Sequence, residues 1–182
     1  FENITFKHKD GDYVVLYCQY NSLEMGDSVI MQGYGNSPGY GTLDGANTMS
    51  FQVFGGINND NRFSPLDTEA LITAMEEAMP HGKEGFTMTF KSGHYSTICA
   101  GGRQTKGELN GVMGTANMPV KCTITMDIDR EWNDEHKSLN TQGQYAHYDA
   151  GIIMAGNHEG AMFGDVDIII RRGKVGRLVN GT

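Results

Sequence analysis

The sequence predicts a mainly β protein, an antiparallel β-sandwich or barrel with one α-helix over about residues 65–79. Two observations carry this prediction. Many short segments alternate apolar and polar residues, and the 182 residues include 25 glycines but only 4 prolines. Alternation with a period of two places one set of side chains in a core and the other in water. Glycine-rich connections between short strands are typical of the tight turns that join antiparallel strands.

The clearest strand signal covers residues 120–129, where Val120, Cys122, Ile124, Met126 and Ile128 alternate with polar residues. Residues 86–90 alternate in the same way, and Lys-Ser-Gly-His at 91–94 offers a turn, so we expect residues 95–100 to return beside them as a hairpin. The N-terminal segments 4–7 and 13–20, joined by Asp10-Gly11, are expected to form another hairpin. Further strands are expected at 28–32, 48–54, 151–154, 161–163 and 166–171.

The helix is predicted from its ends and from its apolar stripe. Ser64 is a suitable N-cap, Pro65 fits the first helical position, and Asp67 follows three residues after the cap. Pro80 and Gly82 are typical of a helix end. The stripe between them consists of Leu66, Ala70, Leu71, Ala74, Met75, Ala78 and Met79.

The length suits one β-rich domain over residues 1–182, with a basic C-terminal segment at 171–182. The net charge is −8, but the last twelve residues carry +4, which leaves −12 for the rest. The acidic body argues against nucleic-acid binding through bulk electrostatics, and no apolar run is long enough to predict membrane insertion. The basic residues Arg171, Arg172, Lys174 and Arg177 either dock onto an acidic face of another copy or an anionic surface, or form a solvated extension.

Residues 33–47 read as a long loop in which glycines alternate with Tyr34, Asn36, Tyr40, Asp44 and Asn47. Tyrosine and asparagine with glycine are typical of adaptable binding loops, because tyrosine offers a large contact area at a low entropy cost. This segment predicts a glycan-binding or small-ligand-binding module as an alternative function. The other interpretation is a surface loop without a ligand.

A second alternative is a metal-assisted hydrolase centred on His147, Asp149, His158 and Glu159. Imidazole and carboxylate groups together can bind a divalent metal or form a general-base pair. Exposed turn histidines are the competing interpretation. The sequence contains no Walker loop, HExxH, paired CxxC or GxSxG motif, and we expect no cofactor.

The three cysteines, Cys18, Cys99 and Cys122, lie in apolar runs without metal-ligand spacing. We interpret them as small buried hydrophobic residues, with one disulfide and one free thiol as the alternative. The acidic residues 127–135 surround the single tryptophan, Trp132, and are interpreted as the solvated end of a strand followed by a loop.

Taken together, these features favour a non-enzymatic structural or adhesive subunit of a β-rich homo-oligomeric assembly, such as a virion, pilus or secreted fibre component. Sheet edges and the basic segment from Arg171 to Arg177 would make the contacts. The expected partners are copies of the chain itself, with a glycan or an anionic surface as the alternative.

Overall fold

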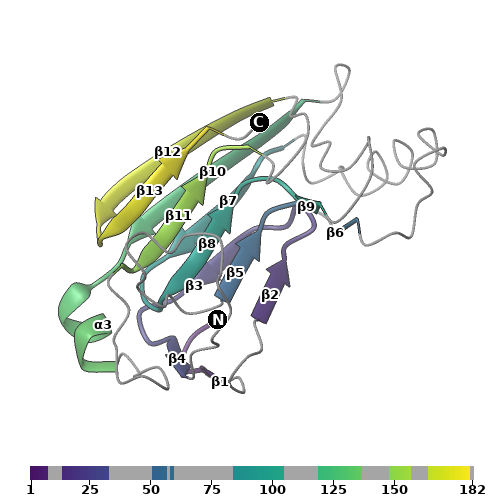
Figure 1. Ribbon diagram of the computed structural model, residues 1–182. Coiled ribbons are helices and arrows are strands. Elements are labelled where there is room, and N and C mark those ends of the chain that lie inside the picture. The colour runs from purple at the N-terminus through teal and green to yellow at the C-terminus, as the bar shows by residue number, and fades with distance from the viewer. Residues whose placement is uncertain are drawn as a thin grey trace.

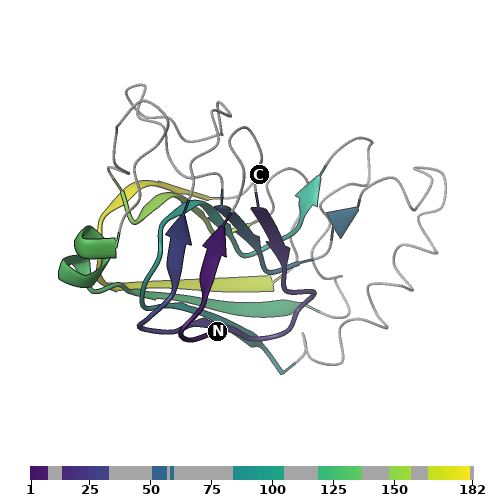
Figure 2. The same cartoon turned by 90° about the horizontal axis from the view of Figure 1, so that it is seen from below.

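The computed structural model describes residues 1–7, 14–32, 51–56, 58–59, 84–104, 119–136, 148–156 and 164–180. Two parallel β-sheets lie against each other and enclose the core (Figures 1 and 2). In sheet order, the four-stranded sheet contains β12 (Gly164–Arg172), β10 (Val120–Asp127), β7 (Phe86–Phe90) and β3 (Leu23–Met25). The five-stranded sheet contains β13 (Val175–Val179), β11 (Ala150–Met154), β8 (Tyr95–Cys99), β5 (Phe51–Phe54) and β2 (Val14–Tyr17).

Two short parallel pairs and one helix complete the described elements. The strand pairs are β1 (Thr5–Lys7) with β4 (Ile30–Gln32) and β6 (Asn58–Asn59) with β9 (Arg103–Gln104). The helix is α3 (Arg130–His136). No helix within these described ranges is long and apolar enough to cross a membrane.

The chain winds between the two sheets as a parallel solenoid. It passes from β2 to β3, from β5 to β7, from β8 to β10 and from β11 to β12, before β13 returns to the five-stranded sheet. Each return lays a new strand beside the previous one in the same direction. The molecule is therefore a stack of layers with two ends.

The antiparallel prediction is wrong, because every strand pair in the described residues is parallel. The expected hairpin of residues 86–90 and 95–100 shows the reason. Its turn carries the chain from one sheet across to the other, so β7 pairs with β3 and β10, whereas β8 pairs with β5 and β11. A tight turn reverses the chain but does not decide which strand becomes its hydrogen-bonded neighbour.

The alternation predicted for residues 120–129 is confirmed over β10, whose even-numbered residues from Val120 to Met126 are buried. The core consists of side-chain rows that run across the strands. One row passes from Met25 through Phe90 and Met126, all fully buried, to Ile170 on β12. The facing row in the other sheet consists of Leu16, Val53, Ile98, Ile153 and Leu178.

The helix predicted over residues 65–79 lies outside the described residues. The acidic stretch after β10 is not a loop, because residues 130–136 form α3. Asp129 caps this helix, since its Oδ1 accepts hydrogen bonds from the backbone N–H groups of Glu131 at 3.0 Å and Trp132 at 3.2 Å. The ring of Trp132 stacks on His136 with centroids 4.0 Å apart.

The interpretation of the cysteines as buried small residues is confirmed for Cys99 and Cys122, and all three cysteines are free thiols rather than one disulfide and one free thiol. Cys99 and Cys122 are buried and Cys18 is half-buried. Burial raises the pKa of the Cys18 and Cys99 thiols to about 12 and raises the pKa of Cys122 well above its usual range.

Candidate assembly interface at the last layer of the stack

The strands β12 and β13 form the last layer of the stack, which we call the terminal layer. Among the described strands, β12 pairs only with β10, and β13 pairs only with β11 (Figure 1). The outer edge of β12 extends over nine residues, three times the length of β3 at the opposite edge of the same sheet. A long strand edge of this kind presents N–H and C=O groups to which another strand can bind.

The core remains open at the terminal layer. Ile170 and Leu178 continue the two core rows, yet they are 40% and 57% exposed, whereas Met126 and Ile153 beside them are fully buried. Ile169, which points to the outer face beside Thr125, is 41% exposed. Solenoid folds usually cover such core positions with a polar cap, whereas the described terminal layer presents Ile170 and Leu178 to solvent.

Charges on β12 are arranged with opposite signs at its two ends. Asp165 and Asp167 lie near its start, and Arg171 and Arg172 end it. The residues between are apolar, with three consecutive isoleucines at 168–170. The strand therefore carries an acidic end, an apolar centre and a basic end within nine residues.

Arg172 is held by the acidic residues of its own chain. Its guanidinium donates to the carboxylate of Asp127 and lies 3.5 Å from that of Asp129. The hydrogen bond to Asp127 and the nearby negative charge raise the pKa of Arg172. The strand register shifts between Met126 and Asp127, which places Arg172 opposite Asp127. Arg171 has no ion pair with any residue in the described part of the chain.

A buried polar cluster anchors the turn of the terminal layer. Asp149 is 3% exposed, and its Oδ2 accepts a hydrogen bond from the backbone N–H of Lys174 at 2.6 Å. Its Oδ1 accepts a bond at 2.9 Å from the side-chain amide of Asn133, which is 1% exposed. Two basic groups lie farther away: Arg130 is 3.5 Å from Oδ2, and His94 Nε2 is 3.9 Å from Oδ1.

Asn133 extends this cluster to the turn between β7 and β8. Its Oδ1 accepts from the N–H of Gly93 at 2.8 Å, and its Nδ2 donates to the C=O of Gly93 at 2.8 Å. The same Nδ2 also donates to Asp149. The pair of side chains thus joins the β7–β8 turn, α3, the start of β11 and the β12–β13 turn. Both carboxylate oxygens of Asp149 are engaged by structural donors, so its role in this arrangement is to position the terminal layer.

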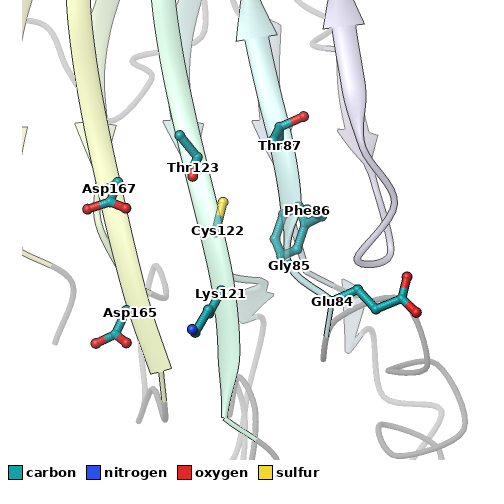
Figure 3. A pocket seen from close by; sticks show the side chains of 9 residues that line it. All are labelled: Glu84, Gly85, Phe86, Thr87, Lys121, Cys122, Thr123, Asp165 and Asp167. Atoms are coloured by element: carbon teal, nitrogen blue, oxygen red, sulfur yellow. The ribbon is translucent and has the colours of Figure 1, made fainter.

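A hollow of about 320 Å³ lies where β7, β10 and β12 begin (Figure 3). Three carboxylates, from Glu84, Asp165 and Asp167, line it together with Lys121, which lies opposite Asp165 in the strand register. In the described residues, no group of three or more His, Cys, Asp and Glu side chains is arranged to hold a metal ion. The hollow adjoins the acidic end of β12 and therefore borders the terminal layer.

The basic residues predicted for assembly lie in the terminal layer. Arg171 and Arg172 end β12, Lys174 follows in the turn, and Arg177 lies in β13. Residues 171–180 are thus largely strand, not a solvated extension. The ammonium of Lys174 lies 5.1 Å from the centre of the Tyr148 ring, a cation–π distance.

The other predicted site residues are mostly beyond the described ranges. The ligand-binding residues lie outside them, namely Tyr34, Asn36, Tyr40, Asp44 and Asn47. Of the metal set, Asp149 is described, whereas His147, His158 and Glu159 are not.

Sequence reasoning missed Asn133, Ser92 and His94, which are buried polar residues. Ser92 Oγ donates to the C=O of Gly26 and accepts from the N–H of Val29 at 2.8 Å, so it joins the β7–β8 turn to the start of the chain. A single serine or asparagine in a polar stretch gives no sequence signal of burial. Comparisons of the chain with protein-family models, curated proteins and solved structures give no match.

Proposed function

We propose that this protein is a structural subunit of a homo-oligomeric assembly and that the terminal layer is its contact surface. One observation carries the proposal: two rows of the hydrophobic core end at Ile170 and Leu178, which are 40% and 57% exposed on the edge of the stack. Covering these side chains and the β12 edge would remove apolar surface from water and satisfy backbone groups.

The opposite end of the four-stranded sheet is covered by the chain itself. The N-terminal ammonium of Phe1 donates to the C=O of Glu24 at 2.7 Å, and the N–H of Gly26 donates to the C=O of Phe1 at 2.8 Å. The backbone of Phe1 therefore occupies the edge of β3. This asymmetry between the two ends supports the terminal layer as the surface for association.

The proposal is tested by the molar mass in solution, measured by sedimentation over a wide range of protein concentrations. We expect masses above the 19.9 kDa of one chain, and we expect Leu178→Lys to reduce association because it places a charge in the open core row. Phe1→Lys is the matched control, since Phe1 is 51% exposed at the other end of the stack. A monomer at every concentration, or equal effects of the two variants, would contradict the proposal.

Point substitutions are the appropriate test, and removal of the basic segment is not. Lys174 contributes its backbone N–H to buried Asp149, and Arg172 pairs with Asp127. A chain cut before these residues would lose β13 and part of the polar cluster as well as its basic charge. Weaker assembly of such a chain would therefore not separate a contact from a folding defect.

A further inference from the structure

We infer that two copies of the chain associate through β12, edge to edge and antiparallel, about a two-fold axis that passes beside Ile169. This inference rests on the proposed function and specifies its geometry. An antiparallel pair of identical strands about a two-fold axis is an isologous contact, so every pairing of two different positions occurs twice, once on each side of the axis. The sequence of β12 suits such a contact because, in an antiparallel pair, the acidic start of each strand lies opposite the basic end of the other.

The register follows from which residues can face one another. A two-fold axis perpendicular to the sheet keeps core-facing residues on the core side, so a residue and its opposite must both be even-numbered or both odd-numbered. With Ile169 facing Ile169 of the second copy, Asp167 faces Arg171 and Ile168 faces Ile170. This register forms two Asp–Arg pairs and places apolar residues against one another in the centre.

The exposure of the β12 side chains and the ion pairs of its two arginines agree with this arrangement. Asp167, Ile169, Ile170 and Arg171 are all exposed, and Arg171 lacks an ion pair within the described part of the chain. Arg172, in contrast, is already paired with Asp127 and Asp129 of its own chain; in this register it faces Val166 of the second copy and forms no Asp–Arg pair between the copies.

A head-to-tail stack of copies fits the structure less well. It would require the nine-residue edge of β12 to pair with the three-residue β3, whose edge is occupied by Phe1. The two-fold contact matches β12 with a strand of its own length and covers the β12 edge of both copies. The unit it produces is a closed dimer, which larger assemblies can use as a building block.

The first experiment uses two variants that each reverse one charge, Asp167→Arg and Arg171→Asp. Each reversal acts twice in the dimer, because it replaces two attractive pairs by two repulsive pairs. We expect the dissociation constant of the dimer to be at least about 30-fold larger for each variant alone than for the original chain. Mixing the two variants restores an attractive pair at both positions, so we expect a heterodimer with nearly the original affinity. Urea unfolding of each variant alone checks that the fold is retained.

The second experiment tests the register by cross-linking. Residues opposite one another at the two-fold axis lie within the Cα separation that a disulfide spans, so Ile169→Cys should form a disulfide-linked dimer under mild oxidation. Thr125→Cys is the matched control, since Thr125 lies beside Ile169 on β10, one strand farther from the axis, and should not cross-link.

The outcomes separate this inference from the proposed function. Heterodimer rescue with cross-linking at position 169 supports both. An oligomer that shows neither result overturns the two-fold β12 contact but leaves the homo-oligomeric subunit standing. A monomer under all conditions, or coverage of β12 by a further segment of a longer chain, overturns both.

Discussion

Replacing Asn133 by alanine removes the side chain that connects the β7–β8 turn to Asp149. The substitution leaves the N–H and C=O of Gly93 without their partners and takes one donor from Asp149 Oδ1, all at a site where Asn133 is 1% exposed. Each buried polar group left unsatisfied costs about 1–3 kcal/mol. Allowing for a water molecule that enters the space, we expect the free energy of unfolding to fall by about 3 kcal/mol.

The assay is urea unfolding at one fixed protein concentration, because association would otherwise shift the apparent stability. With a denaturant slope of about 2–3 kcal/mol/M, the midpoint should fall by at least about 1 M. Glu135→Ala is the control on the same helix, since Glu135 is exposed and should change the midpoint little. A loss below about 1 kcal/mol for Asn133→Ala would refute the view that this amide is a structural hub.

Asn133→Asp provides a second test that separates the individual bonds. The aspartate retains an oxygen that can accept from the N–H of Gly93, but it loses the donor and places a carboxylate against Asp149. We therefore expect slow hydrogen exchange at the Gly93 amide together with a stability loss at least as large as that of alanine. Equally fast exchange in both variants would show that the Oδ1 bond does not protect this amide.

Two further predictions concern the thiols and one glycine. At pH 8 a disulfide reagent should react very slowly with Cys99 and Cys122 of the folded protein, because burial keeps both thiols protonated until far higher pH. All three cysteines should react after unfolding. Fast reaction of Cys99 or Cys122 in the folded protein would contradict their burial. Gly164→Ala should cost at least about 2 kcal/mol in urea unfolding. The glycine has φ of 144°, and an added Cβ would lie 1.8 Å from the C=O oxygen of Val120, so an unchanged midpoint would refute this geometry.

The sequence was sufficient to predict several strands but not how they pair. The alternation over β10 indicates its buried face directly. Strand direction is a different matter, because a half-buried strand shows the same alternation in parallel and antiparallel sheets. One usable signal was present in β11, whose residues 150–154 (Ala-Gly-Ile-Ile-Met) include no polar side chain; such continuous apolar runs are typical of strands covered on both faces in parallel sheets, and β11 is buried at every position.

The candidate interface was predictable only in its charges. Clustered arginines near the end of the chain are visible in the sequence, and their use in assembly was a direct hypothesis from them. It was not predictable that Arg172 is paired within the chain whereas Arg171 is not paired with a described residue, because this depends on a register shift that brings Arg172 opposite Asp127. The exposure of Ile170 and Leu178 depends on their position in the last layer, which no local pattern encodes.

The charge distribution supports the proposed contact between two terminal layers. Each copy carries −8, so contact between most pairs of faces would bring like charges together. Residues 164–179 contain Asp165 and Asp167 together with Arg171, Arg172, Lys174 and Arg177, which gives this layer a net +2 and leaves −10 on the rest of the chain. A contact between two terminal layers would place the acidic bodies at opposite ends of the proposed dimer. Such a contact would combine two exposed core rows, a β12 edge that pairs with no other described strand, and opposite charges on one surface with a net positive charge.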